Sequence, residues 1–317
     1  MTIPTAILFP GQGSQESGMG RDLAEANREA LDTWKQAERA SGLELRAIYW
    51  EGGDSDMADT RALQPALTVV NLNLWRVLSA KASPAATAGH SLGEYSSLAA
   101  AGVLSVDAVL ELVALRGRLM AEADPEGKGT MAAMLKLSLA DAEGAVAEVA
   151  AATGEMIGVA NYNTPGQYVA SGTKAAIAAL QDAVKARKGR ALPLPVSGAF
   201  HSPLMNEAAT EMAKALEKAS WSPAKFAVYP NVTGKATTDP RELKKLLLEQ
   251  MTSSVRWIDT ITAQYSDGVR HFVECGPKGV LSKMVKPILD AHPAAPAPES
   301  YSVAVAGNRE QAEAFQG

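Results

Sequence analysis

The chain has 317 residues, of which 47% are hydrophobic and 21% are charged, and its formal net charge at pH 7 is −5. This composition is typical of a folded globular protein that can bury a sizeable core in one or two domains. A negative net charge argues against nucleic acid as a partner, because phosphate contacts need a concentrated basic face. We therefore expect small molecules or proteins as partners.

The single cysteine, Cys275, excludes an intramolecular disulfide and is typical of a reducing compartment. The N-terminal segment MTIPTAILFPGQG lacks the basic region and the cleavage site of a signal peptide. Asp107 and Glu111 interrupt the longest apolar stretch before it could span a bilayer. We therefore expect a cytoplasmic protein without membrane association.

The first part of the chain alternates strand-like and helix-like segments. Apolar runs predict strands at residues 5–9 and 84–88. Helical periodicity predicts helices at residues 22–40, 64–80, 92–101 and 106–123. This alternation predicts an α/β fold with a parallel sheet.

A glycine-rich loop, LFPGQGSQ at residues 8–15, follows the first expected strand. It is not a phosphate-binding loop, because the spacing G-x-G-x-x-G fails and the lysine of a P-loop is absent. We interpret it as a loop that offers backbone N–H groups to a neighbouring oxyanion.

The second expected strand leads into Gly89-His90-Ser91-Leu92-Gly93, which has the pattern G-x-S-x-G. Between a strand and a helix this pattern mounts a serine on a tight turn, and the flanking glycines leave room for the backbone. The hydroxyl then faces a helix N-terminus, which favours developing negative charge. Ser91 is therefore a candidate nucleophile, although so short a pattern needs support from elsewhere.

The helix expected at residues 106–123 carries Arg116 on the same face as Val109, Leu112 and Met120. Its side chain should therefore point inward. A buried guanidinium needs an anionic partner. The pattern leaves open whether that partner is a protein carboxylate or a substrate.

The pattern changes after residue 127. It predicts strands at residues 130–137, 156–160, 167–171 and 191–196, and helices at residues 140–152 and 174–188. The order β-α-β-β-α-β is ferredoxin-like, so we predict a small domain at residues 128–197 inserted into a large domain of residues 1–127 and 198–317. Such an insertion implies a cleft.

Beyond the insertion the chain returns to the large domain. We expect a helix at residues 204–219, strands at residues 226–229, 269–274 and 301–305, and a surface loop at residues 291–298.

Four histidines are candidates for a general base. His90 should point away from Ser91, and His271 and His292 lie in an apolar strand and a Pro/Ala-rich loop, so we expect structural roles for these three. His201 lies where the chain leaves the small domain, which is where a cleft residue is expected. No Cys/His or paired-His spacing indicates a metal site.

Together these segments resemble the malonyl-CoA:acyl carrier protein transacylases of fatty acid synthesis and the acyltransferase domains of polyketide synthases. The resemblance runs almost from end to end and implies a hydrolase-like α/β large domain with a ferredoxin-like insertion. It is carried by FPGQGSQ at 9–15, QPAL at 64–67, GHSLGEYSSLAAAG at 89–102, RG at 116–117, NYNTPGQYVASG at 161–172, AFH at 199–201, YPNVTG at 229–234 and ECGPKGVLSKM at 274–284.

The resemblance implies a role for each matching site residue. Ser91 would be the nucleophile and His201 the base. Backbone N–H groups of Gln12 and Leu92 would form the oxyanion hole. Arg116 would bind the malonyl carboxylate through two parallel hydrogen bonds.

Two further residues carry implied roles. Main-chain carbonyls near Gln250 would orient the histidine, in the place where a conventional triad has an aspartate. In polyketide acyltransferases HAFH accompanies malonyl use and YASH accompanies methylmalonyl use. This chain has GAFH at residues 198–201, so Phe200 favours malonyl and Gly198 departs from the pattern.

The implied reaction moves malonyl from malonyl-CoA to the phosphopantetheine thiol of an acyl carrier protein, through a malonyl-serine intermediate and without another cofactor.

Four basic residues form either a docking patch for an acidic carrier or a solvated charge run: Lys185, Arg187, Lys188 and Arg190. The alternatives are loading of polyketide carrier domains and, in another class, a serine esterase or thioesterase. A noncatalytic binding module is disfavoured because all the site residues are present.

Overall fold

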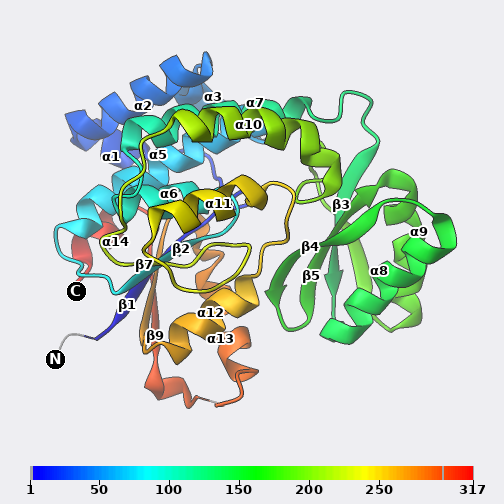
Figure 1. The fold of residues 1–317 in the computed structure, drawn as a ribbon. Helices are drawn as coiled ribbons and strands as arrows, with labels where there is room; N and C mark the ends of the chain where they lie inside the picture. Colours follow the sequence, from blue (N-terminus) through cyan, green and yellow to red (C-terminus); the bar gives the residue numbers. More distant parts are fainter. Residues whose placement is uncertain (1–2, 295, 317) are drawn as a thin grey trace.

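The computed structural model describes residues 3–294 and 296–316. Five strands form a parallel sheet in the order β7-β2-β1-β8-β9, and four strands form an antiparallel sheet in the order β4-β5-β3-β6. In Figure 1 the antiparallel sheet lies at the right, with α8 and α9 against it. The expected α/β fold, with a parallel sheet in the large domain and a ferredoxin-like small domain, is confirmed.

The parallel sheet has an apolar central strand because both of its faces are covered. Ile7 and Phe9 of β1 pack into a core with α2, α5 and α7, whereas Ala6 and Leu8 pack into a second core with α12 and α13. The strands are β1 Thr5–Phe9, β2 Ala86–Gly89, β7 Ala227–Val228, β8 His271–Cys275 and β9 Ser302–Ala306.

Helices on the first face extend well beyond the sheet (Figure 1). They are α1 Arg21–Ala26, α2 Arg28–Ser41, α3 Leu45–Glu51, α4 Asp54–Met57, α5 Thr60–Ser79, α6 Gly93–Ala100, α7 Val106–Glu122, α10 Asn206–Lys218 and α11 Pro240–Gln250. On the other face lie α12 Trp257–Ser266 and α13 Ser282–Asp290, whereas α14 Arg309–Ala314 packs beside α5 into the core of the first face. Short 3-10 turns lie at Pro203–Met205, Pro277–Gly279 and Pro298–Ser300. None of the helices described is long and apolar enough to cross a membrane.

The small sheet presents its two faces to different partners. Ala132 and Met134 of β3 pack under α8 and α9, while Met131 of the same strand joins the core of the large domain. Because side chains alternate between the two faces of β3, one face of this sheet packs against the large domain and the other against α8 and α9. The elements are β3 Gly129–Leu135, α8 Leu139–Thr153, β4 Ile157–Thr164, β5 Gln167–Thr173, α9 Lys174–Ala186 and β6 Arg190–Pro193.

The expectation of one helix over residues 22–40 is wrong. Asn27 has an extended backbone (φ −137°, ψ 121°), and its side chain accepts hydrogen bonds from the N–H groups of Glu29 and Ala30. Asparagine is a preferred N-cap, so α1 ends and α2 begins here. The strand expected at residues 156–160 also continues to Thr164, which leaves only Pro165 and Gly166 as the hairpin turn.

Candidate active site

Ser91 lies on a strained turn between β2 and α6, with φ at 51° in the left-handed region. A Cβ atom on Gly89 would lie 1.9 Å from the carbonyl carbon of Gly93, and one on Gly93 would lie 2.0 Å from the carbonyl oxygen of Phe9. Only glycine allows these backbone segments to approach so closely. The two glycines of the sequence pattern are therefore what permits this turn.

Gln12 reaches the same place because β1 and β2 are parallel neighbours. Phe9 pairs with Gly89 in the register, so the loops that follow leave the sheet at the same edge. Gln12, Ser91 and Leu92 all line one pocket. Among the described residues the Gln12 and Leu92 N–H groups have no hydrogen-bond acceptor, so both are available to an oxyanion.

His201 completes a serine–histidine pair. Its Nε2 lies 2.8 Å from the Ser91 hydroxyl oxygen, and its Nδ1 lies 3.1 Å from the carbonyl oxygens of Gln250 and Ser253. A carbonyl oxygen only accepts, so Nδ1 carries the proton and Nε2 is left to accept one from Ser91. Burial and then the charge of Arg116 lower the pKa of His201 to about 3, which keeps the imidazole neutral near pH 7.

Arg116 points inward, as periodicity predicts, and is 1% exposed. Its terminal nitrogens donate to Gln64 Oε1 at 2.9 Å, Gln250 Oε1 at 3.1 Å and the Ser91 hydroxyl at 3.2 Å. Its guanidinium carbon lies 5.6 Å from the ring centre of Tyr95, at cation–π distance. Among the residues described, Arg116 makes no direct ion pair with a carboxylate, and its Nε has no hydrogen-bond partner.

The pocket at Ser91 has a volume of about 100 Å³. Met120 of α7, Met131 of β3 and Phe200 supply its apolar walls, so a helix of the large domain and the antiparallel sheet both contribute to it. Phe200 is 5% exposed and sits directly before His201. A small acyl group with one charged end matches this lining: an apolar wall and one arginine.

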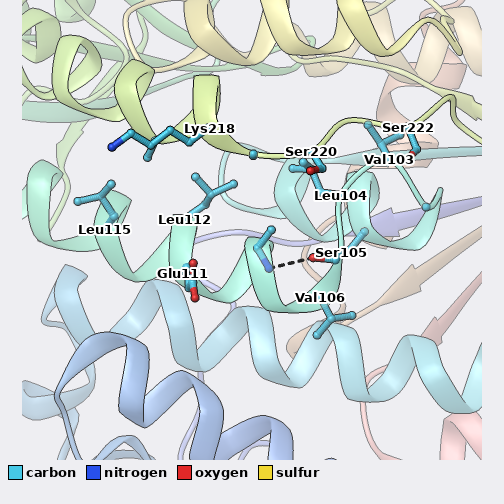
Figure 2. Close-up of a pocket in the computed structure, with 15 residues that line it drawn as sticks. Val103, Leu104, Ser105, Val106, Glu111, Leu112, Leu115, Lys218, Ser220 and Ser222 are labelled. Atoms are coloured by element: carbon cyan, nitrogen blue, oxygen red, sulfur yellow. Dashed lines mark hydrogen bonds between the residues drawn. The ribbon is translucent and has the colours of Figure 1, made fainter.

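A larger cavity of about 800 Å³ lies elsewhere, between the start of α7 and the end of α10 (Figure 2). Its rim carries Lys218 and Glu111, and Ser105 in its lining accepts a hydrogen bond from the N–H of Ala108. Ser91, His201 and Arg116 do not line it. Cavity size therefore does not locate the chemistry in this molecule.

The sequence analysis assigned no role to the side chains that hydrogen-bond to the backbone around Ser91. Asn231 Oδ1 accepts the Ser91 N–H at 2.6 Å, and its Nδ2 donates to the Gly89 carbonyl at 2.6 Å. Glu94 Oε2 accepts from the Asn231 N–H at 3.1 Å and from Gln250 Nε2 at 2.8 Å. Asn231 lies in YPNVTG and Glu94 in GHSLGEYSSLAAAG, so both belonged to noted motifs without an assigned role.

The other histidines and Cys275 lie outside the pair. His90 Nε2 lies 2.8 Å from Asn163 Oδ1 and its ring packs against Trp257, while His271 Nδ1 lies 2.6 Å from the Ser302 hydroxyl. Burial raises the pKa of the Cys275 thiol well above its usual value. His271 and Cys275 do not line the pocket at Ser91, whereas His90 does, so the expectation that His90 points away from the site is wrong.

A family model described as acyl transferase domain matches residues 7–316. The chain belongs to the acyl transferase domain family. A malonyl CoA-acyl carrier protein transacylase of Haemophilus influenzae is 40% identical over 291 residues, which cover 90% of this chain and 92% of that relative. An acyl carrier protein S-malonyltransferase of Vibrio cholerae superposes with a TM-score of 0.89 at 37% identity, covering 98% and 99% of the two chains.

A third relative adds a partner. It is a malonyl-transacylase solved in complex with a type II polyketide synthase acyl-carrier protein, with a TM-score of 0.89 and 36% identity over 98% of this chain and 97% of that one. The acyl transferase match runs from β1 to the end of α14, so it includes the antiparallel sheet as well as the parallel one.

Proposed function

We propose that this protein transfers malonyl from malonyl-CoA to the phosphopantetheine thiol of an acyl carrier protein. The observation that carries the proposal is the position of Arg116, whose terminal nitrogen lies 3.2 Å from the Ser91 hydroxyl oxygen. A buried guanidinium next to a nucleophile selects an acyl group that ends in an anion. The relatives named above are malonyl transferases, which supports the same substrate.

The first half of the reaction acylates Ser91. His201 Nε2 takes the hydroxyl proton as the Ser91 oxygen attacks the thioester carbonyl carbon. The resulting oxyanion accepts hydrogen bonds from the N–H groups of Gln12 and Leu92. The carbon–sulfur bond then breaks, His201 returns its proton to the coenzyme A thiolate, and malonyl-Ser91 remains.

The second half passes the acyl group to the carrier. His201 accepts the proton of the phosphopantetheine thiol, and the sulfur attacks the carbonyl of malonyl-Ser91. The Ser91 oxygen leaves and recovers a proton from His201. The chemistry uses the chain's own groups, one thioester substrate and one thiol substrate, without a further cofactor.

A third charged residue is not needed in this scheme. The carbonyl oxygens of Gln250 and Ser253 already fix the tautomer of His201. A thiolate is also a better leaving group than an amine, which relaxes the demand on the base. We infer that these carbonyls orient His201 in place of an aspartate.

Phe200 supports malonyl over methylmalonyl. Its ring lines the pocket with Met131, and a Cβ atom on Gly198 would lie 3.4 Å from Phe200 Cε1, in ordinary contact. The glycine at 198 therefore leaves the ring no additional space of consequence. We propose that the narrow pocket disfavours a branched acyl group.

Fatty acid synthesis is the proposed pathway, in the cytoplasm, with residues 128–197 as the inserted small domain. Loading of polyketide carriers is the second candidate, because one relative was solved with such a carrier.

An assay with several thioesters distinguishes the proposed transferase from an esterase. Purified protein is mixed with malonyl-, methylmalonyl- and acetyl-CoA, with and without holo carrier, and released coenzyme A and acylated carrier are measured. Malonyl transfer that depends on the carrier supports the proposal, and coenzyme A release that continues over many turnovers at the same rate without carrier refutes it.

A further inference from the structure

The charge of Arg116 needs a counter-charge that its direct partners do not provide. Gln64, Gln250 and Ser91 are neutral, yet the guanidinium is 1% exposed and stays protonated. Leaving such a charge uncompensated in a protein interior is strongly destabilising. The compensating carboxylate must therefore lie in a second layer, behind the side chains that contact Arg116 directly.

Glu94 is the carboxylate in that layer. Its side chain is 1% exposed, in the first turn of α6, where the helix N-terminus also favours negative charge. Burial raises the pKa of Glu94 to about 7, while hydrogen bonds from Gln250 and Asn231 and the charge of Arg116 oppose that rise. The same carboxylate opposes the lowering of the Arg116 pKa by burial.

The Gln250 amide links the two charges. Its Nε2 donates to Glu94 Oε2 at 2.8 Å and to the Ser91 carbonyl at 2.9 Å, and its Oε1 accepts from Arg116 at 3.1 Å. The first two partners only accept and the guanidinium only donates, so the amide has a single satisfactory orientation. The chain from carboxylate to guanidinium thus runs through one polarised amide.

We propose that Glu94 is a positioning residue that compensates Arg116 through the Gln250 amide and thereby keeps the guanidinium available for the carboxylate of the substrate. The inference rests on the proposed malonyl transfer. A carboxylate in direct contact with Arg116 would take up hydrogen-bond donors that the substrate needs. Glu94 is separated from Arg116 by the Gln250 amide, so it supplies the negative charge while the Arg116 Nε donor stays unpartnered in the described structure.

The test is the isosteric variant Glu94→Gln. The amide oxygen of a glutamine can still accept from Asn231 and Gln250, so the change removes the charge and retains both hydrogen bonds. The kcat/KM values for malonyl-CoA and acetyl-CoA are compared at about pH 8, where the carboxylate is ionised. Acetyl-CoA has no carboxylate and does not need Arg116.

We expect the malonyl-to-acetyl ratio to fall by roughly tenfold or more in Glu94→Gln. The double variant Glu94→Gln/Arg116→Met should show the low ratio of Arg116→Met alone, because both changes act on one interaction. Glu274→Gln is the control for loss of a buried carboxylate away from the site, since Glu274 is also fully buried; its two oxygens each accept a backbone N–H of α13 or the preceding turn, so this change removes a hydrogen bond as well as the charge. That control should leave the ratio unchanged.

Equal losses for the two substrates in Glu94→Gln, or an unchanged ratio, would overturn the inference. If the wild type itself does not prefer malonyl, the proposed function fails instead. A Glu94→Gln protein too unstable to assay is examined by urea unfolding. The second change to Arg116→Met should then raise its midpoint, because the uncompensated charge is gone, and a midpoint that stays low would equally overturn the inference.

Discussion

The Ser91 hydroxyl oxygen lies 2.8 Å from Nε2 of His201, although the two residues are 110 positions apart. The chain between them includes α6, α7 and the whole small sheet. Both residues have positive φ, 51° for Ser91 and 56° for His201, so two strained backbone positions face each other. The rest of the fold therefore holds both residues in a backbone conformation that their own sequences disfavour, at the place where chemistry is proposed.

Arg116→Ala is expected to lose malonyl transfer by about 10²-fold or more while keeping or gaining acetyl transfer. The reason is that the substrate carboxylate would enter a buried pocket without a partner. Steady-state kinetics with both thioesters measure the effect, and Arg118→Ala, a change two positions away on the exposed face of α7, is the control. Unchanged malonyl kinetics in Arg116→Ala would contradict the assignment.

His201 should make the fold sensitive to acid. Its pKa is lowered from 6.5 to about 3 in the folded state, so between these values the unfolded chain binds more protons. Stability from this group is present above pH 6.5 and is lost as the pH falls toward 3, by at most about 1.4 kcal/mol per pH unit. Urea unfolding across this window should show a shallower pH dependence in His201→Gln than in the wild type.

The comparison for that experiment is His292→Gln, in a surface loop where the imidazole lies near the Ser266 hydroxyl. It should retain the wild-type slope. An identical slope in His201→Gln would mean that His201 is not buried in its neutral form.

Gly93→Ala should destabilise the fold by about 2–5 kcal/mol, because a Cβ atom there would lie 2.0 Å from the Phe9 carbonyl oxygen. Backbone atoms at that position cannot move aside without disturbing β1. Gly158→Ala is the matched control, since nothing lies within 4 Å of its Cβ position. Chemical denaturation compares the two, and similar midpoints would show that the turn tolerates a side chain.

The basic patch is a separate prediction about the carrier. Arg187 is largely engaged, because it donates to Glu148 Oε2 at 2.8 Å and to the Ala183 carbonyl. Lys185, Lys188 and Arg190 are exposed, so charge reversal of these three should raise the KM for the carrier several-fold at low salt. The KM for malonyl-CoA should not change. An unchanged KM for the carrier would identify the patch as a solvated charge run.

Local pattern was sufficient for the elements that carry the site. The apolar run at residues 5–9 is β1, G-x-S-x-G marks the turn at Ser91, and the 3.6-residue period placed Arg116 inside. The break at Asn27 was missed because a capping asparagine also fits a helical pattern. Residues 240–250, 257–266, 282–290 and 309–314 also went unassigned, and these short helices depend on packing against the rest of the fold.

The hydrogen bonds among Glu94, Asn231 and Gln250 could not be predicted from the sequence for a different reason. Glu94 meets Asn231 and Gln250 across 137 and 156 positions of sequence, and no periodicity reports such a contact. The resemblance supplied the main-chain role of Gln250 but not its side-chain amide. Only the fold brings those groups to one place.

The central claim is that Ser91 holds a malonyl group until a thiol accepts it. Intact-mass analysis after mixing with malonyl-CoA tests this directly, with Ser91→Ala as the control and holo carrier added in a second step. The account predicts a malonyl adduct on the wild type, none on Ser91→Ala, and faster discharge to carrier than to water. An adduct that persists in Ser91→Ala, or one that hydrolyses as fast without carrier as with it, would contradict the account.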